Sequence, residues 1–328
     1  MSNLDLTPAR RWCYAAVCLL LLSACQRSDV TAGAAEPAAA VRQLATHLQQ
    51  GELNAFARAA VPPAEHAALA RAWADGDSLW PLTGLPLDDH LPDLLATLAA
   101  EDAAASLRRA HRNQFVGQGA TLRQTAHALG LFGSQYVQHQ GGYSAEQREH
   151  YRQLVTGLGR WAGQAGLDDA ERAGLAIDQL TAAVRDSGID GLPALQAAGM
   201  EGALERLAPV QQALLAVLAS HGLDLGQSLG QLQAGLVSED GDTALVQVQY
   251  PFAGETISFQ ARMLRRDGRW YMAQNLADAE QALEKAALAR QQREAAAAEA
   301  AARAAAEAAD GGEPAAVAGR DGEMATGP

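Results

Sequence analysis

The hydrophobic period of this chain changes once, after Gly235, and that change constrains the fold more than any other feature. Before it, apolar residues recur at helical spacing, as Val41 and Leu44 do. After it, apolar and polar residues alternate, which is the pattern of strands with one buried face. The sequence therefore predicts a mostly α fold of the α+β kind, with a helical domain over 37–234 and an antiparallel β-meander over 235–274 packed on it.

Turn signals divide the second region into strands. Alternating runs cover 244–250 and 256–263, and Asp267-Gly268 follows the second run. This dipeptide is typical of a type I′ hairpin turn, because both central residues of that turn need positive φ. A further short strand is expected at 236–237, which makes three or four strands in all. A sheet of this size needs helices against its apolar face.

Within the helical region, 204–218 is the most apolar segment. We expect it at the centre of the helical bundle, with Pro209 at a kink or a local helix start. Ser144 is the predicted N-cap of the helix that follows it. Proline and glycine crowd 76–92, so this stretch is expected to be a long loop, and it carries Trp80.

The segment 275–310 contains no Gly or Pro and is dominated by Ala, Glu, Gln and Arg. This composition predicts one long helix capped by Asn275. Past Leu288 only Ala is left to form an apolar seam, so the second half of the helix is expected to project into solvent. The remaining residues, 311–328, are predicted to be a disordered tail.

Residues 1–24 have the parts of an export signal: two arginines, a short apolar run and small residues before a cysteine. The apolar run is shorter than the roughly 20 residues that a membrane-spanning helix needs. The tetrad Leu22-Ser23-Ala24-Cys25 closely resembles the lipobox of bacterial lipoproteins. That resemblance implies cleavage before Cys25, acylation of Cys25, for example by palmitate, and attachment of the mature chain to a membrane through this lipid.

The residue after the cysteine is Gln26, whereas an Asp at this place in the family pattern retains a lipoprotein at the inner membrane. The resemblance therefore implies the periplasmic face of the outer membrane, with 25–36 as a tether that reaches about 40 Å when extended. The alternative is a soluble exported protein cut by ordinary signal peptidase. Cys13 and Cys18 leave with the signal, so the mature domain has neither a disulfide nor a thiolate metal site.

The charge of the chain disfavours one class of partner. With 25 basic and 38 acidic residues, the formal net charge is −13. Removal of Arg10, Arg11 and Asp5 with the signal takes two positive charges and one negative charge away, which leaves −14. Such a charge opposes binding to phosphate backbones and to anionic lipid headgroups. We therefore expect no nucleic-acid partner.

Candidate site residues are few. Tyr136, His139 and Tyr143 surround a diglycine in a predicted interhelical loop, where binding residues often lie. Glu146 and His150 are four residues apart on the next helix and could present two metal ligands, but a solvated pair is the simpler interpretation. The sequence has no His-Glu-x-x-His zinc motif, Walker loop or Gly-x-Ser-x-Gly elbow. It predicts no metal, no cofactor and no catalytic residue.

Residues 236–273 resemble the closing hairpins of small NTF2-like domains, in that an Asp-Gly turn precedes Trp270-Tyr271. This resemblance implies an apolar pocket. The first functional hypothesis is a structural or protein-interaction lipoprotein that contacts another envelope protein through the C-terminal helix. The alternative is a lipoprotein that binds a small molecule in a pocket, and the third hypothesis is a hydrolytic enzyme without a recognisable motif.

Overall fold

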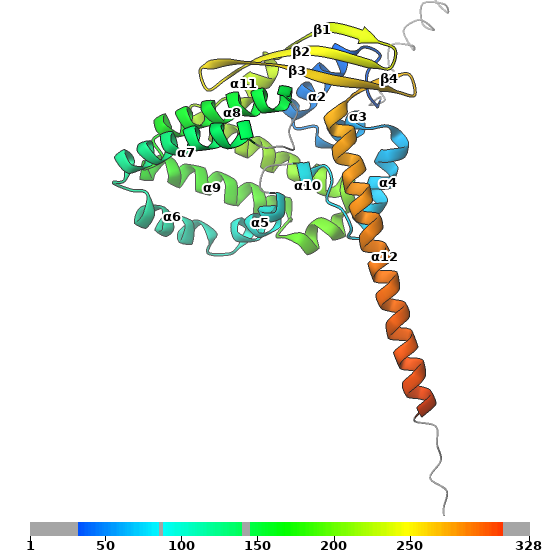
Figure 1. Ribbon diagram of the computed structural model, residues 1–328. Coiled ribbons are helices and arrows are strands. Elements are labelled where there is room, and N and C mark those ends of the chain that lie inside the picture. The colour runs from blue at the N-terminus through cyan, green and yellow to red at the C-terminus, as the bar shows by residue number, and fades with distance from the viewer. Residues whose placement is uncertain (1–31, 85–87, 140–144, 311–328) are drawn as a thin grey trace, which may run out of the picture.

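The computed structural model of the protein describes residues 32–84, 88–139 and 145–310. Within these residues, eleven α-helices surround one face of a single sheet, which confirms the predicted mostly α fold (Figure 1). The helices are α2 (Pro37–Gln50), α3 (Leu53–Ala60), α4 (Pro63–Ala74), α5 (Leu91–Ala99), α6 (Ala103–Gln114), α7 (Gly119–His139), α8 (Ala145–Gln164), α9 (Ala170–Ser187), α10 (Leu192–Ser220), α11 (Leu225–Gly230) and α12 (Ala273–Asp310), with 3-10 helices η1 (Leu82–Gly84) and η2 (Asp88–His90).

The predicted meander is confirmed as one antiparallel sheet in the order β1-β2-β3-β4. Its strands are β1 (Gln233–Asp240), β2 (Thr243–Phe252), β3 (Glu255–Arg266) and β4 (Arg269–Met272). Asp267 and Gly268 have φ values of 49° and 74°, the positive values that a type I′ turn needs. β1 is longer than the predicted strand at 236–237, and a register shift between Leu236 and Ser238 marks a bulge in this edge strand.

One face of the sheet is buried, as its alternating pattern predicted. Val246 and Met263 have no exposed surface, and Ala40 and Val41 of α2 pack against the same cluster. Burial of side chains of this kind contributes about 1.5 to 3 kcal/mol each. The helices lie beneath the sheet in Figure 1 and supply the cover that so small a sheet requires.

The β4 side of the sheet has no long open edge. Trp270 of β4 donates its backbone N–H to the Ala34 carbonyl at 2.8 Å, so the residues before α2 extend the sheet. Beyond the short β4, α8 lies beside β3, where the Gln153 amide donates to the Ser258 carbonyl at 3.0 Å and accepts from the Ser258 N–H at 2.9 Å. A glutamine side chain thus takes the place of a neighbouring strand at this position.

The main core lies among α3, α4, α10 and the first part of α12. Trp73 is fully buried and donates through Nε1 to the Leu195 carbonyl at 3.0 Å, which satisfies the only polar atom of its ring. The expectation that 204–218 forms the centre of the bundle is right for its first part and wrong for its second. Leu204 is 1% exposed, whereas Leu214 is 45% exposed.

The break in α10 lies at a different residue from the one predicted. Gly199 has φ 67° and ψ 170°, outside the helical region, and Pro209 lies inside the helical stretch that follows. Glycine takes positive φ without the steric cost that a Cβ imposes, so the chain turns at Gly199 and continues through Pro209.

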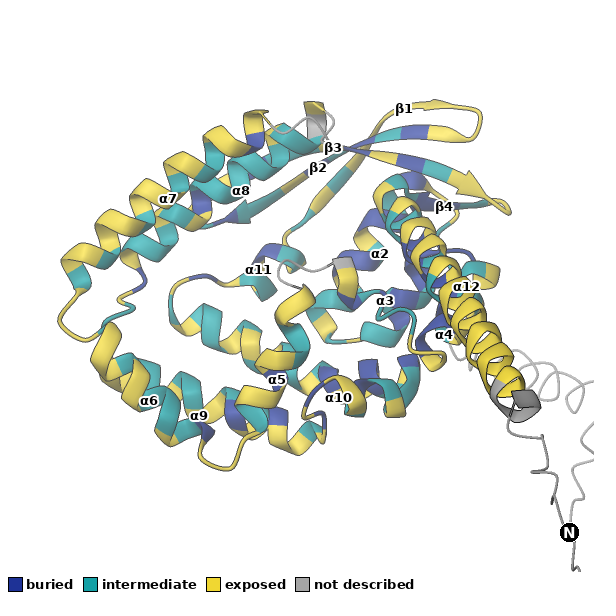
Figure 2. Ribbon diagram, turned by 60° about the horizontal axis from the view of Figure 1, so that its bottom comes forward, coloured by how far each residue is buried: buried dark blue, intermediate teal, exposed yellow. Residues whose placement is uncertain are grey.

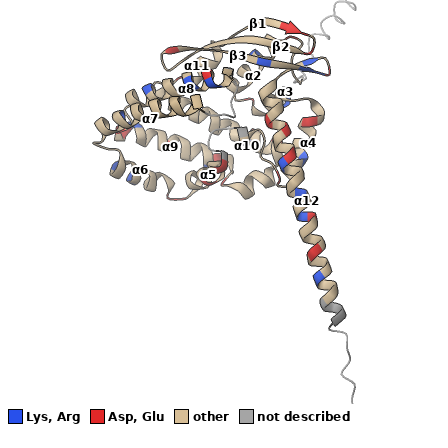
Figure 3. Cartoon of the chain, in the orientation of Figure 1, with Lys and Arg blue, Asp and Glu red and all other residues tan. Residues whose placement is uncertain are grey.

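α12 is a single long helix, as predicted, but its start is different. It begins at Ala273, directly after β4, so Asn275 lies in the first turn and is not the N-cap. The first part packs through Ala279 and Ala286, which are 0% and 2% exposed. All of 290–306 is exposed (Figure 2), and this part carries both acidic and basic residues (Figure 3). The predicted projection into solvent is confirmed.

α7 and α8 form a closely packed hairpin. A Cβ on Gly159 would lie 2.8 Å from the Gly130 Cα, so the two helices need glycine at their crossing. The other side of α7 carries exposed apolar residues, namely Leu129, Phe132 and Tyr136. None of the helices in the described residues is both long and apolar enough to span a bilayer.

Candidate functional site: an apolar cavity with unpaired amides

A cavity of about 360 Å³ lies between α3, α5, α10 and the first turns of α12. Its volume is within the range of about 300 to 1,000 Å³ that is usual for small-molecule sites. Most of the wall is apolar: Leu48, Leu53, Phe56, Ala60, Trp80, Pro81, Leu82, Leu91, Leu95, Leu204, Leu207, Val210 and Leu214. The polar part of the wall consists of Gln211, Asn275 and Asp278.

Helical spacing brings the α10 side of the wall together. Leu204 and Leu207 begin an apolar stripe, and Leu214 continues it at a distance of ten residues from Leu204. Gln211 lies seven residues after Leu204, so it takes a position in this stripe that favours another apolar residue. An amide has therefore been placed among leucines on the face that lines the cavity.

The α12 side of the wall follows the same spacing. Asn275 and Asp278 are three residues apart in the first turns of α12, and Ala282 continues this face of the helix. Ala282 is 8% exposed and belongs to the main core. The face of α12 that enters the core therefore starts with an amide and a carboxyl group, both of which line the cavity.

Two amide atoms of this wall are buried without a hydrogen-bond partner among the described residues, Gln211 Oε1 and Asn275 Nδ2. The orientation of the Gln211 amide is set by its Nε2, which donates to the Leu48 carbonyl at 2.8 Å. A buried polar atom without a partner costs about 1 to 3 kcal/mol, and native proteins leave few of them. These two amide atoms are therefore a local energetic cost of the fold beside the cavity.

Asp278 is the ionisable group of the cavity. Burial raises the pKa of its carboxyl group, because removal from water disfavours the charged form. A smaller opposite effect comes from Gln274, whose Nε2 donates to Asp278 Oδ1 at 2.7 Å. The Oε1 of Gln274 in turn accepts a hydrogen bond from Gln147 of α8. The hairpin thus holds the amide that orients the carboxyl group.

The predicted loop at 76–92 supplies another wall. Trp80 is 3% exposed, and its backbone N–H donates to Ser78 Oγ at 3.1 Å. A cis peptide bond joins it to Pro81, and Leu82 begins η1 directly afterwards. The aromatic residue that the sequence placed in a long loop is therefore part of the cavity lining.

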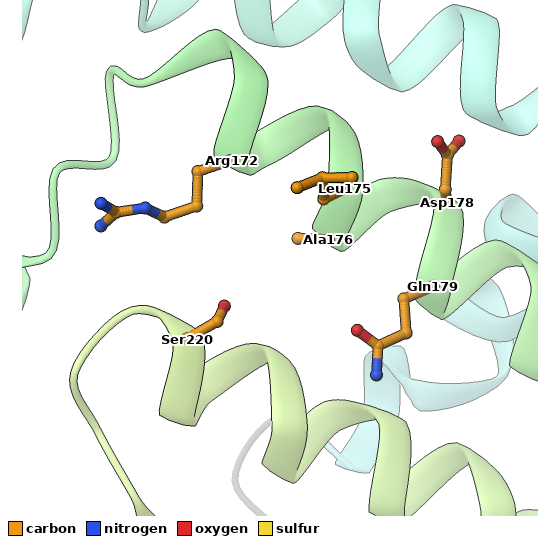
Figure 4. Close-up of a pocket in the computed structure, with 6 residues that line it drawn as sticks. All are labelled: Arg172, Leu175, Ala176, Asp178, Gln179 and Ser220. Carbon is orange, nitrogen blue, oxygen red and sulfur yellow. The ribbon is translucent and has the colours of Figure 1, made fainter.

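A larger depression of about 660 Å³ lies between α9 and the end of α10 (Figure 4). Its charged side chains point in different directions and are engaged with other parts of the chain. Arg172 Nη1 donates to the Ala165 carbonyl at 3.3 Å, and Asp178 forms an ion pair with Arg108. Because its polar groups do not converge, this depression is a weaker candidate than the smaller apolar cavity.

A third cavity, of about 450 Å³, lies between α8, β3 and the start of α12. His150 stacks on Phe259 with 3.9 Å between ring centroids, and its Nε2 lies 3.0 Å from the Tyr250 hydroxyl. Burial lowers the pKa of His150 to about 4 and raises that of Tyr250. The half-buried imidazole and the phenol therefore satisfy each other, and the predicted pair of His150 with Glu146 stays a prediction.

The site residues singled out by sequence do not line the apolar cavity. Tyr136 is 56% exposed and stacks on Phe132, with ring centroids 6.3 Å apart. His139 is exposed, and its Nδ1 lies 2.7 Å from the Gln135 carbonyl. Tyr143, Ser144, Cys25 and the side chain of Glu146 lie outside the described residues. No group of three or more potential metal ligands occurs in the part of the chain that the structure describes.

A signal for the cavity was present in the sequence. Gln211 interrupts an apolar helix, and Asn275 and Asp278 stand on the face of a helix whose later alanines are buried. Polar residues at apolar positions are informative only when the buried face is known, and the tertiary structure supplies that face.

Comparisons with protein-family models, curated proteins and solved structures found no match to this chain. The lipobox and NTF2-like resemblances therefore stay predictions from sequence.

Proposed function

We propose that this chain is an outer-membrane lipoprotein that binds a small, mainly apolar molecule in the cavity between α3, α5, α10 and α12. The observation that carries this proposal is an apolar cavity of about 360 Å³ whose wall has only three polar residues among those that line it, Gln211, Asn275 and Asp278. Among the three sequence hypotheses, this observation favours the binding protein over the purely structural module.

The energetic argument is that an empty apolar cavity is unfavourable, because its wall loses dispersion contacts. A ligand with an apolar body restores these contacts. An apolar wall with a few polar groups is the usual design of a small-molecule site.

Blocking the cavity tests this function. Residues 26–328, the proposed mature chain without the acylated Cys25, would be produced and titrated with the uncharged fluorescent amphiphile N-phenyl-1-naphthylamine. Leu214→Trp, at the partly exposed edge of the cavity, is expected to weaken binding at least tenfold. The matched control is Leu175→Trp in the depression of Figure 4, which should bind as the unmodified chain does.

Equal binding by both variants would place the probe elsewhere, and the absence of binding by the unmodified chain would contradict the function. Native mass spectrometry of protein from its own cells provides an independent measurement. A bound molecule that is lost in Leu214→Trp and retained in Leu175→Trp is the expected result.

The anchor is tested separately. Cys25→Ser is expected to abolish incorporation of labelled palmitate, because the thiol of Cys25 is the proposed acceptor. Cys18→Ser, inside the signal, should leave labelling unchanged. Labelling that persists in Cys25→Ser would remove the support for a lipoprotein. Two or more acyl chains are needed for a durable attachment, at roughly 0.8 kcal/mol per buried methylene.

The exposed end of α12 favours a second function, contact with another envelope protein. Its residues 290–306 are exposed, and past the ion pairs of Arg290 and Arg293 its length at about 1.5 Å per residue carries it away from the core. A photo-reactive residue at Ala297 should then form a cross-link in intact cells, whereas one at exposed Leu175 should not. Cross-linking at neither position would leave the cavity as the functional part of the described chain.

A further inference from the structure

We infer that β1 is a docking edge for a second copy of this chain, and that two copies pair antiparallel through β1 into one continuous sheet. The sheet order β1-β2-β3-β4 gives β1 a strand neighbour on only one side among the described residues. Figure 2 shows β1 exposed at the outer edge of the sheet. The free side of such a strand presents backbone N–H and C=O groups with which another strand can pair. This inference goes beyond the apolar cavity and does not depend on it.

The two edges of the sheet differ in how far the rest of the chain covers them. On the β4 side, the backbone of Ala34 pairs with Trp270, and the Gln153 side chain takes the place of a strand beside β3. On the β1 side, Arg42 of α2 reaches the start of the strand, where its Nη1 donates to the Ala234 carbonyl at 2.8 Å. Residues 235–240, the rest of β1, are all exposed.

The centre of β1 carries two exposed apolar side chains. Leu236 and Val237 are 52% and 51% exposed. Leu236 lies opposite Val246, which is fully buried beneath the sheet, so the helices that cover Val246 leave Leu236 half open. A second β1 paired at this place would bury part of both side chains in cross-strand contacts, which are the unit of stabilisation in a sheet.

The charges along β1 select a second copy as the occupant. Arg42 lies beside Ala234 at one end of the strand, and Glu239 and Asp240 form the other end. All three charged side chains are exposed, and none of them has an ion pair within the described part of the chain. A charge at a sheet edge usually keeps other strands away. Here antiparallel self-pairing brings the basic end of each copy to the acidic end of the other.

The spacing of these groups fits a two-fold axis. Ala234 lies two residues before Leu236, and Glu239 lies two residues after Val237. Antiparallel pairing centred on Leu236 and Val237 therefore places Glu239 of one copy opposite Ala234 of the other, beside Arg42. Because the contact is isologous, the same pair of charges occurs twice.

The faces of the sheet match as well. Ala234 lies opposite Val248 of β2, and Glu239 lies opposite Ala244. Val248 and Ala244 belong to the cluster buried beneath the sheet, so Ala234 and Glu239 point to the face that α2 covers. A two-fold axis perpendicular to the sheet keeps this face on the same side in both copies. The Glu239 carboxylate therefore arrives on the side from which Arg42 reaches the strand.

Reversal of one charge in each copy tests this pairing. Residues 26–328 would be studied by sedimentation velocity at physiological ionic strength, which screens the net charge of −13 beyond about 8 Å. The unmodified chain should form a dimer. Arg42→Glu and Glu239→Arg, each alone, should dimerise at least about tenfold more weakly, because like charges then oppose each other at both contacts.

An equimolar mixture of the two charge variants should restore the dimer, because each contact then joins opposite charges again. A variant that had merely lost its fold could not be rescued in this way. Arg123→Glu, an exposed reversal on α7, is the matched control and should dimerise as the unmodified chain does. Two weakened variants whose mixture stays weak would overturn the proposed contact.

A lysine at the centre of the strand provides a second test. Val237→Lys should weaken the dimer at least about tenfold, since lysine on an edge strand blocks pairing. Leu175→Lys on α9, where the side chain is 67% exposed, should leave it unchanged. A dimer that survives Val237→Lys and both charge reversals would form through another surface and overturn the inference. An unmodified chain that is monomeric at every concentration would overturn it too.

Discussion

The two parts of α12 are both rich in alanine but have opposite environments. Between Ala273 and 289 the helix lies in the main core, with Ala279 and Ala286 buried. Between 290 and 306 every residue is exposed to solvent. Propensity explains why both parts are helical, because Ala, Glu and Arg all favour a helix. The leucines of α12 lie in the first part, where Leu276 and Leu283 pack against the core, so sequence and packing agree on which part the fold embeds.

Two arginines at the border between the two parts of α12 form ion pairs with the rest of the fold. Arg293 contacts the Asp77 carboxylate through both guanidinium nitrogens, with Nη2 to Oδ2 at 2.7 Å, and Arg290 Nη2 lies 3.5 Å from Asp75 Oδ2. Both acidic residues follow α4, so the helix is attached to the fold one turn past its last buried alanine. Composition alone does not separate these arginines from Arg303, whose pair with Glu299 lies within the exposed part.

The largest expected difference comes from a charge placed in each part. Ala279→Glu puts a carboxylate where the side chain is 0% exposed and should lower the free energy of unfolding by about 3 to 5 kcal/mol. Ala297→Glu, in the exposed part, should change it by less than about 0.5 kcal/mol. Chemical denaturation of both variants measures the contrast, and equal effects would mean that α12 is not embedded as described.

A smaller effect of opposite sign is expected at Asn275. Asn275→Leu removes a buried unpaired donor and adds apolar surface, so it should raise the free energy of unfolding by about 1 kcal/mol. Gln292→Leu in the exposed part buries nothing and should leave it unchanged. A fall in stability for Asn275→Leu would show that this amide is satisfied in the folded protein.

The arginine contact should contribute a small, pH-dependent stabilisation. The hydrogen bond from Arg293 holds the pKa of Asp77 below its usual value of 3.8. A depressed carboxyl pKa stabilises the folded state above the unfolded pKa, and this contribution is lost as the pH falls through the folded pKa. Arg293→Ala should therefore lower the melting temperature slightly at pH 7, and the difference from the unmodified chain should shrink as the pH falls through the lowered pKa of Asp77.

The smallest effect is expected from shortening the helix. A chain that ends after Glu294 keeps both arginine contacts and, among the described residues, loses only exposed ones, so its melting temperature should match that of the whole chain. A chain that ends after Ala289 should show the same small decrease as removal of the arginine contacts. Hydrogen exchange provides a second measurement, and strong protection of amides beyond 295 would contradict the description of this part as unsupported.

Much of the fold could be predicted because its signals are local. The alternation in β2 and β3, the turn at Asp267-Gly268 and the end of α9 at Gly188 each depend on a few neighbouring residues. Errors occurred where local rules compete. A proline usually breaks a helix, so the break in α10 was predicted at Pro209. It lies at Gly199 instead, because glycine takes positive φ without the steric cost of a Cβ.

The candidate site could not be predicted in the same way. Its walls come from α3, the segment at Trp80, α5, α10 and α12, so that Leu53 and Asp278, which lie far apart along the chain, line the same cavity. Tyr136 and His139 attracted attention because they are close together in sequence, yet they remain at the surface. Sequence proximity identifies loops and motifs, whereas this cavity exists only where distant helices meet.

By itself, the sequence determined which segments are helix and strand, the single meander and the projecting end of α12. These features depend on backbone propensity and on periods of two or 3.6 residues, which neighbouring residues settle. The tertiary structure alone decided that Gln211, Asn275 and Asp278 share one apolar cavity. It also decided that Asp77 and Arg293 meet and that His150 stacks on Phe259. Burial and pairing of this kind depend on which surfaces face each other, and that is a property of the packed chain.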